Sequence, residues 1–202
     1  MSKYLGPKLK IVRRLGELPG LTKKIPKKKY MSGEHSNLNK KLSEYAIRLQ
    51  EKQKLKFNYG LNERQMLNYI KKSRKLKGST GLSFLQFLEM RLDNIIFRLG
   101  MATTIPAARQ LVNHGHINVN NKNINIASYQ CKIGDIINIK QRNRSKKIIE
   151  SNMNSLKFSY IPDHLNLNKN NMSAKILKLV EKDSIPFKIN ELLIVEYYSR
   201  KI

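Results

Sequence analysis

The chain has 202 residues, of which 40% are hydrophobic, so it is long enough for one or two domains with a real core. Forty Lys and Arg residues against fourteen Asp and Glu residues give a formal net charge of +26 at pH 7. A chain with this excess repels itself and is stabilised by a dense anion, for which nucleic acid is the strongest candidate. No apolar run approaches transmembrane length, so we expect no membrane partner.

The N-terminal residues 1–42 are rich in Lys, Gly and Pro and show little hydrophobic periodicity. This composition predicts a basic extension that lies on a partner rather than packing into a core. The excess of positive charge is also greatest in residues 1–80. We therefore expect contacts with phosphate groups to be densest in the N-terminal part of the chain.

Residues 43–78 predict two helices. Ser43 can cap the first helix, and Gly60 can end it. Asn62 and Gln65 have the spacing of a capping box, in which each side chain accepts a hydrogen bond from the backbone N–H of the other residue. The second helix runs into KKSRKLKG, whose cations suit a helix C-terminus. The capped helix should hold these cations in fixed directions.

The strongest apolar pattern follows. Leucine and isoleucine recur at alternating spacings of three and four residues, which predicts one helix that ends at Gly100. The apolar stripe consists of Leu85, Leu88, Leu92, Ile95 and Leu99. Arg91, Asn94 and Arg98 share another face of this helix. Because Arg91 and Arg98 are two turns apart, we expect them to project together toward RNA.

A shorter helix and a small sheet come next. Thr104 can cap the helix, Pro106 is tolerated in its first turn, and Gly115 suits the left-handed conformation at its end. Alternating apolar and polar residues then predict strands with inward side chains at positions 117, 119, 124 and 126. The expected strands are Ile117–Val119, Ile124–Ile126 and, as the last one, Ile136–Ile139, with a hairpin turn at Asn120–Lys122.

Two histidines, His114 and His116, flank Gly115 at this corner. No Cys, Asp or Glu completes a metal site with them, and the single cysteine, Cys131, excludes both an internal disulfide and a multi-cysteine zinc site. We therefore expect no metal and no cofactor. The alternative is one exposed and one half-packed histidine on an edge whose donors and acceptors suit phosphate, ribose hydroxyls and base edges.

The remaining chain is less informative. Residues 141–187 are rich in Asn and Lys and indicate no clear element. The closing segment KINELLIVEYYSRKI predicts a short helix with Asn190 as its cap.

Residues 89–140 resemble the RNA-binding module named after ribosomal small-subunit protein four. The resemblance extends beyond the module and keeps the order of the family's segments. These segments are YLGPKLKIVRR at 4–14, LSEYAIRLQEKQKLKFNYGLNERQ at 42–65, KGSTG at 77–81 and INELLIVEYYSR at 189–200. The combined pattern covers most of the chain and is specific to this family, although residues 150–187 match it poorly.

The resemblance implies an α+β fold in which a mainly helical domain carries an inserted helix–helix–hairpin RNA-binding module. The implied domains are a basic extension at 1–42, a helical domain at 43–88 completed by 188–202, the module at 89–150 and a variable connecting segment at 151–187. The resemblance also implies a structural constituent of the small ribosomal subunit. Such a protein is a primary binder of 16S-type rRNA that nucleates assembly of the subunit body, contacts small-subunit protein five and contributes to translational accuracy.

The chain departs from the family pattern in two places. Many bacterial members hold zinc with four cysteines near the N-terminus, where this chain has none, so no metal is carried over. Members often have Asn-Gly at the hairpin, where Asn120-Asn121 should form a slightly strained turn.

The amino-acid sequence at 57–64 and 87–114 is most similar to that of plastid-encoded members. The abundance of Asn, Ile and Lys suits an AT-rich organelle genome, and no transit peptide precedes the family's usual start. We expect a plastid (chloroplast) ribosome as the location, with the cytoplasm of an AT-rich bacterium as the alternative.

Two other functions are compatible with parts of the sequence. Arg91-Leu92-Asp93 is similar to the catalytic Arg-Leu-Asp of pseudouridine synthases, but a helical stripe continues where those enzymes have a loop, so we expect Asp93 to pair with a neighbouring Arg. No other catalytic arrangement appears, and we expect neither an enzyme nor a small-molecule substrate. A free-standing RNA chaperone associated with ribosomes would need only the module and a basic tail, and the segments outside the module argue against it.

The expected RNA-binding residues combine the basic runs, the second helix and the edge of the module. They are Lys8, Lys10, Arg13, Arg14, Arg48, Lys52, Lys54, Arg64, Lys72, Arg74, Lys77, Arg91, Arg98, Arg109, Asn113, His116 and Lys122. Among them, we expect Arg91, Arg98, Arg109, His116 and Lys122 to line one surface.

Overall fold

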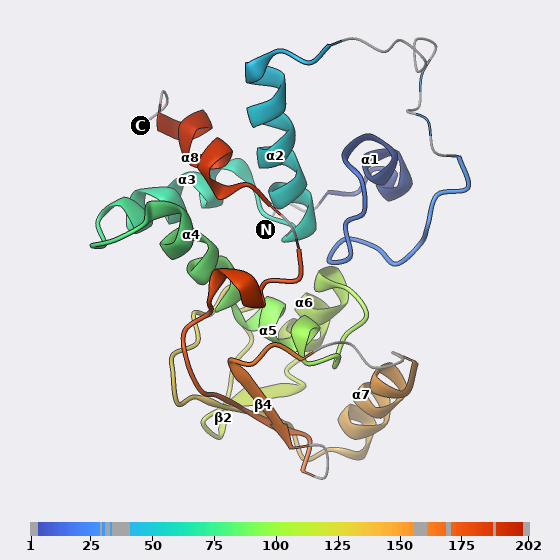
Figure 1. Ribbon diagram of the computed structural model, residues 1–202. Helices are drawn as coiled ribbons and strands as arrows, with labels where there is room; N and C mark the ends of the chain where they lie inside the picture. The colour runs from blue at the N-terminus through green and yellow to red at the C-terminus, as the bar shows by residue number, and fades with distance from the viewer. Residues whose placement is uncertain are drawn as a thin grey trace. The chain divides into compact units, whose positions relative to one another are not determined.

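The computed structural model describes residues 4–28, 30, 33, 41–155, 161–168, 171–187 and 189–199 (Figure 1). The chain divides into two compact units. Unit 1 comprises residues 1–84 and 188–202, and unit 2 comprises residues 85–187. Helices together with an antiparallel sheet confirm the predicted α+β class. None of the helices in the described ranges has both the length and the apolar character that a membrane crossing requires.

Unit 1 is helical. Its elements are α1 (Lys8–Leu15), α2 (Glu44–Asn58), α3 (Glu63–Arg74), α8 (Glu191–Ser199) and the first half of α4 (Thr80–Glu89), whose second half belongs to unit 2. The C-terminal helix α8 packs against α2, although more than a hundred residues of chain separate them (Figure 1). The rings of Tyr45 in α2 and Tyr197 in α8 lie in a tilted arrangement, with their centroids 5.8 Å apart.

The predicted helix caps of unit 1 are confirmed. Ser43 Oγ accepts a hydrogen bond from the backbone N–H of Ala46 at 3.2 Å. Asn62 and Gln65 form the reciprocal capping box, with bonds of 2.7 and 3.2 Å. The side chain of Asn190 accepts from the backbone N–H of residue 192 at 3.1 Å. These bonds satisfy orphan donors in the first turns and so fix where α2, α3 and α8 begin.

The expectation that residues 1–42 do not pack into a core is wrong for the part the structure describes. Helix α1 buries Val12 and Leu15, and Leu18 and Leu21 after it are also buried. The backbone N–H of Gly20 donates to the side chain of Asn58 in α2 at 2.9 Å. Four apolar side chains removed from water are enough to anchor a segment whose remaining residues are cationic.

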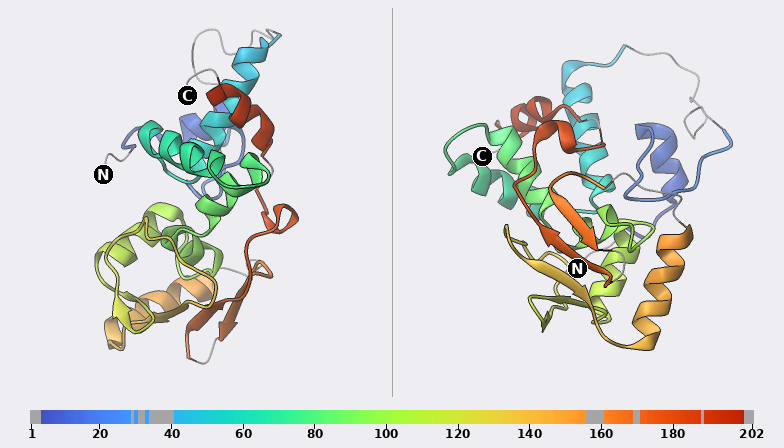
Figure 2. Two further views of the ribbon diagram at one scale, coloured as in Figure 1. Left: turned by 90° about the vertical axis from the view of Figure 1, so that its left-hand side faces the viewer. Right: turned by 60° about the horizontal axis from the view of Figure 1, so that its bottom comes forward.

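Unit 2 combines helices with a five-stranded antiparallel sheet of order β2-β1-β3-β5-β4 (Figure 2). Its elements are α5 (Leu92–Arg98), α6 (Ile105–Asn113), β1 (Ile117–Val119), β2 (Lys122–Asn123), β3 (Ile136–Ile139), α7 (Asn143–Ser155), β4 (Leu165–Asn168), β5 (Ser173–Ile176) and the short 3-10 turn η1 (Lys182–Ser184). One face of the sheet and helices α5, α6 and α7 contribute to a single hydrophobic core. At the start of α6, the backbone N–H of Ala107 donates a hydrogen bond to Thr104 Oγ1 at 3.3 Å, which confirms the predicted cap.

The expectation of a single helix that ends at Gly100 is wrong, because the helical conformation is interrupted between α4 and α5. Here Cys131 N–H donates to the carbonyl of Met90 and Leu92 N–H donates to the carbonyl of Tyr129, both at 2.9 Å. Arg91 forms an isolated antiparallel bridge with residue 130 between these two bonds. Pairing with a distant segment therefore outweighs the local preference for a continuous helix.

The expected strand at Ile124–Ile126 is also wrong. Asn120 and Asn121 take positive φ values of 49° and 64°, so the hairpin turns over these two residues and β2 begins at residue 122. Strand β2 ends at Asn123, so Ile126 lies beyond the paired residues and is 57% exposed instead of pointing into the core. Positive φ at both turn positions is what a two-residue hairpin loop of type I′ requires, and Asn tolerates it. The inward orientation of Ile117 and Val119 is confirmed.

The sheet does not end at Ile136–Ile139 as expected. Strand β5 pairs with β3, aligning Lys175 with Ile136, and β4 pairs with β5 in turn. Leu165 is buried in β4, whose sequence is LNLN, and Ala174 and Ile176 are buried in β5. The segment that carried little sequence signal therefore extends the sheet of the module.

Candidate RNA-binding surfaces

Helix α3 is amphipathic in a way that separates core from cations. Met66, Tyr69, Ile70 and Ser73 are buried on one side. The other side exposes most of the basic side chains of the helix and of the turn after it. These exposed cations are Arg64, Lys71, Lys72, Arg74, Lys75 and Lys77. No ion pair joins them to a carboxylate in the parts of the chain that the structure describes, so their positive field is directed to solvent.

Helix α1 adds a second group of cations in unit 1. Lys10 and Arg14 are exposed, and Lys8 is half-buried. Arg13 is tied down, since its Nε donates to the backbone carbonyl of Tyr30 at 2.8 Å and its guanidinium lies 5.2 Å from that ring's centroid. Lys10 and Arg14 therefore form no ion pair with any residue that the structure describes, whereas Arg13 helps to hold the chain after α1.

Three expected RNA-binding residues on α2 are engaged in ion pairs within unit 1. Arg48 contacts Glu196 at 2.8 Å and Glu44 at 3.2 Å. Lys52 is buried, bonds to Glu63 at 3.0 Å and lies 4.8 Å above the ring of Tyr197. Lys54 pairs with Glu51 in the preceding turn of α2. The expectation that Lys52 faces RNA is wrong, because its ammonium group lies inside the helical packing.

In unit 2, Asp93 lies between two arginines. Its carboxylate binds the guanidinium of Arg91 through two bonds, of 3.0 and 2.8 Å, and that of Arg109 at 2.7 Å. Asp93 and Arg91 are fully buried, and the side chain of Arg109 is 12% exposed. The hypothesis that Asp93 pairs with a neighbouring Arg is confirmed. The arrangement ties the start of α5 to α6.

A second buried ion pair joins the end of α4 to the end of α5. Glu89 accepts two bonds from Arg98, at 2.6 and 3.0 Å, and one from the side chain of Asn94. Only 1% of the Glu89 side chain and 7% of the Arg98 side chain are exposed. Their charges are mutually neutralised and shielded from any phosphate at the surface.

The expectation that Arg91 and Arg98 line a common RNA-facing surface of the module is therefore wrong. Each guanidinium is buried against a carboxylate that also lies inside the unit, because a buried charge is tolerated only when it is paired and hydrogen-bonded. Arg109 is nearly buried for the same reason. These three arginines hold elements of unit 2 together through buried carboxylates.

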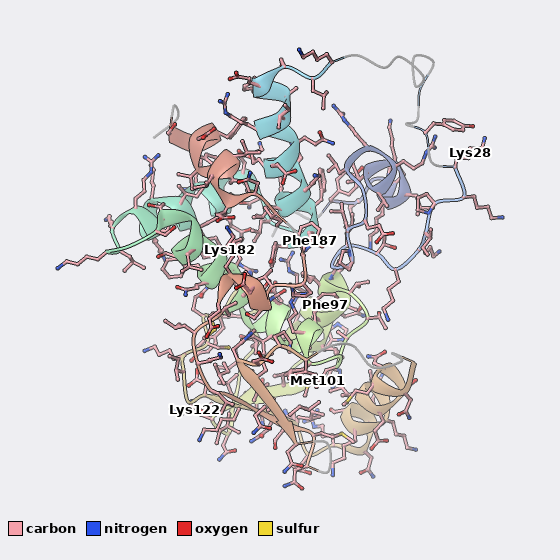
Figure 3. All side chains as sticks on the ribbon, in the orientation of Figure 1. Lys28, Phe97, Met101, Lys122, Lys182 and Phe187 are labelled. Atoms are coloured by element: carbon pink, nitrogen blue, oxygen red, sulfur yellow. The ribbon has the colours of Figure 1, made fainter. Side chains whose placement is uncertain are left out.

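The rest of the predicted edge is accessible. Asn113 and Lys122 are exposed, and Lys122 lies at the outer margin of unit 2 (Figure 3). His114 is exposed, while the half-buried His116 forms a 2.9 Å hydrogen bond between its Nδ1 and Ser145 Oγ. Gly115 between them has φ 68°, as the predicted corner requires. The interpretation of one exposed and one half-packed histidine is confirmed.

Side chains capable of metal binding or nucleophilic chemistry are not clustered. Among the described residues, no group of three or more His, Cys, Asp or Glu side chains could hold a metal ion. The Cys131 thiol is buried, and burial raises its pKa to about 12, with Asp135 and Asp93 adding to the effect. A thiol in this state is neither a nucleophile nor a ligand at neutral pH. The accessible chemistry is that of cations and amides.

The sequence was compared with models of protein families and with known proteins. Residues 3–89 match the model of the ribosomal protein S4/S9 N-terminal domain, and residues 90–137 match that of the S4 domain. The small ribosomal subunit protein uS4 of Thermosynechococcus vestitus is 55% identical over 202 residues, and that of Acaryochloris marina is 58% identical over 201 residues, each across 100% of both chains. The small ribosomal subunit protein uS4c of Cyanophora paradoxa is 58% identical over 201 residues, across 99% of this chain and 100% of its own.

The chain belongs to the uS4 family of small ribosomal subunit proteins. The resemblance seen in the sequence is thus confirmed. The matched S4 domain ends at residue 137, before the last strands of unit 2 and before α7.

One group of cations in this uS4 family member lies outside the set of expected RNA-binding residues. Lys140, Arg142 and Arg144 precede or begin α7, next to the corner formed by His114 and His116. Arg142 and Arg144 are exposed. The signal that could have revealed the group is the run KQRNRSKK, which carries five cations and no acid directly before a helical pattern.

Proposed function

We propose that this chain is a structural constituent of the small ribosomal subunit that binds 16S-type rRNA directly. The observation that carries the proposal is the set of exposed cations on α1 and α3, such as Lys10, Arg14, Arg64 and Lys72, which form no ion pair with a described residue, in a chain of net charge +26. These cations neutralise RNA phosphates and release counterions, which is a sequence-independent source of affinity. Membership of the uS4 family supports the same role.

We further propose that binding occurs early and nucleates assembly of the subunit body, that the protein contacts small-subunit protein five, and that it contributes to translational accuracy. These statements rest on the family resemblance. Capped helices in unit 1 support early binding, because a backbone that is already helical loses less conformational entropy when its cations meet RNA.

We also propose that the protein is not an enzyme. The carboxylate that is similar to a catalytic aspartate, Asp93, is enclosed by the guanidinium groups of Arg91 and Arg109 and is buried. Such a carboxylate stabilises a fold but has no access to a nucleobase. The compared relatives are named as ribosomal proteins.

The location we propose is the ribosome of a plastid. The plastid (cyanelle) relative of Cyanophora paradoxa and the cyanobacterial relatives support this, because both belong to the lineage expected for a plastid protein. The cytoplasm of an AT-rich bacterium is the alternative location.

Sedimentation tests the function. Tagged protein is expressed in cells, and small ribosomal subunits are separated on gradients at low and at high salt. A core constituent stays with the subunit at high salt in near-stoichiometric amount. Release into the top fractions at high salt would instead support a ribosome-associated chaperone and overturn the proposal.

A further inference from the structure

Five side chains that carry or can gain a positive charge converge at one corner of unit 2. They are His114, His116, Lys140, Arg142 and Arg144. Two segments bring them together, since Lys140 N–H donates to the carbonyl of His116 at 2.9 Å and the His116 ring bonds to Ser145 in the first turn of α7. The ring centroids of the two histidines are 6.1 Å apart. We refer to these five residues as the corner cluster.

The corner cluster differs from the other dense group of cations in unit 2. Arg91, Arg98 and Arg109 are each paired with a buried carboxylate. By contrast, no ion pair joins a member of the corner cluster to Asp or Glu within the described ranges, and the charged groups that act on His116 are all cations. Like charges gathered without a counter-charge repel one another, and an external anion relieves that repulsion.

The accessibility of the cluster suits an external ligand. His114, Arg142 and Arg144 are exposed, while His116 and Lys140 are half-buried. Arginine offers a planar fork of donors that matches phosphate oxygens, and lysine adds a point charge. The bond to Ser145 occupies Nδ1 of His116, and Nε2 makes no hydrogen bond to any described residue, so it is available to a ligand.

We propose that the corner cluster is a binding site for a phosphate of the RNA backbone, and that His116 takes up a proton when the phosphate binds. The inference rests on the proposed rRNA-binding function and extends it to a defined site. Three of the five residues lie beyond the matched S4 domain.

Proton uptake follows from the surroundings of His116. Burial lowers the pKa of His116 below its ordinary value of 6.5, and repulsion by His114, Arg144, Arg142 and Lys140 lowers it further. The imidazole is therefore neutral at pH 7 in the free protein. A bound phosphodiester, which carries one negative charge, offsets the neighbouring cations and attracts the protonated ring, which raises the pKa of His116 in the complex.

The sign of the pH effect is then fixed. A pKa that is higher in the complex than in the free protein adds affinity below the free-state pKa, and this gain is lost as pH rises through the bound-state pKa. RNA affinity should therefore be greater at pH 5.5 than at pH 8. A shift of one pKa unit corresponds to about a tenfold gain.

The test compares full-length protein with its His116→Asn variant, whose amide can replace the bond from Nδ1 to Ser145. Affinity for the 5′ domain of 16S-type rRNA is measured at pH 5.5 and 8 at constant ionic strength. We expect the ratio of the two affinities to be about three- to tenfold larger for the wild type than for the variant. A Lys72→Ala/Arg74→Ala protein is the matched control, because it should bind more weakly at both pH values with an unchanged ratio.

A second measurement does not depend on the variant's folding. The ring resonances of His116 are followed by NMR in wild-type protein, with and without a short RNA helix from that domain, and the proposal requires a higher pKa in the complex. Equal pH ratios for wild type and variant, or an unchanged pKa, would overturn the site while leaving rRNA binding intact. Absence of RNA binding at every pH would overturn the proposed function as well.

Discussion

Helix α3 and the α5–α6 region are both rich in cations, and the two regions use them in opposite ways. On α3, residues such as Arg64 and Lys72 are exposed, and no ion pair joins them to a carboxylate in the described part of the chain. In the α5–α6 region, Arg91, Arg98 and Arg109 are buried or nearly so, and each one binds a carboxylate. The total charge of the chain therefore says little about which cations reach a partner.

The difference lies in where the few acidic residues are placed. The whole chain has only fourteen Asp and Glu residues, yet Glu89 and Asp93 both lie in the core of unit 2. A carboxylate in the core attracts guanidinium groups inward and is satisfied by them. Where no carboxylate lies nearby, the cations remain at the surface and are available to phosphate. Removing a carboxylate or a cation in either region tests this division.

The largest effect should follow the loss of Glu89. Glu89→Gln removes the negative charge that neutralises Arg98 and leaves a buried guanidinium without full compensation. Breaking a buried ion pair by removing one partner costs about 3–5 kcal/mol. Urea denaturation of the full chain, with Cm and m-value both determined, should show a loss of this size in the free energy of unfolding.

The matched control removes both charges. Glu89→Leu combined with Arg98→Met replaces the pair by apolar groups, and we expect most of the lost stability to return, because such replacements are often neutral. If the single and double variants were equally unstable, packing volume and not the uncompensated charge would be the cause, and the contrast between the two regions would lose its basis.

The second effect concerns the corner next to α6. Gly115→Val places a β-branched side chain at φ 68°, and its Cβ would lie 3.3 Å from the amide of Asn123. We expect a loss of about 1–3 kcal/mol in stability, since that backbone conformation is strained for Val. RNA affinity should fall with it, although no contact residue is altered. Gly115→Asn serves as control, because Asn tolerates positive φ, and a loss as large as that for Val would point to contact with the residue's atoms and not to strain.

The third effect compares two exposed groups of cations. Alanine substitution of Arg64, Lys72 and Arg74 should lower rRNA affinity more than alanine substitution of Arg142 and Arg144. The capped α3 holds its cations in fixed directions, and the excess of positive charge is greatest in the N-terminal part. Stability should change by less than about 0.5 kcal/mol per surface substitution. Filter binding decides the matter, and equal losses at both sets would count against the ranking.

The smallest effect is a pH dependence of stability in unit 2. His164 is buried, and neither ring nitrogen has a hydrogen-bond partner among the described residues. Burial lowers the pKa of His164 from its ordinary 6.5, Glu89 and Asp163 oppose this, and Arg98 and Lys178 add to it. Because the unfolded chain then binds more protons below pH 6.5, stability decreases as pH falls. The Tm of the wild type should drop more between pH 7.5 and 5.5 than that of His164→Leu, and parallel curves would refute the assignment.

Local features of the fold could be predicted from the sequence, because their causes are local. The caps at Ser43, Asn62 and Thr104 depend on side chains within three residues of the backbone groups they bind. The glycine corner and the Asn-Asn turn depend on which residues tolerate positive φ. Features of this kind are independent of how the rest of the chain folds.

Features that depend on distant segments could not be predicted in the same way. The break after α4 exists because residues 90–92 bond to residues 129–131, and the added strands β4 and β5 exist because β3 offers them an edge. The orientation of Arg91 and Arg98 follows from that break. The sequence does contain one indication that these arginines are paired. Glu89 and Asp93 are acidic residues next to an apolar stripe in a chain that is otherwise strongly basic.

We infer that exposed cations of this uS4 family member bind rRNA phosphates directly. The most direct test is a titration of purified protein against the 5′ domain of 16S-type rRNA at several salt concentrations. If roughly ten or more phosphates are contacted, the logarithm of the affinity should fall with the logarithm of the salt concentration with a slope of about −7 or steeper. An affinity that stays flat between low and moderate salt would contradict the account.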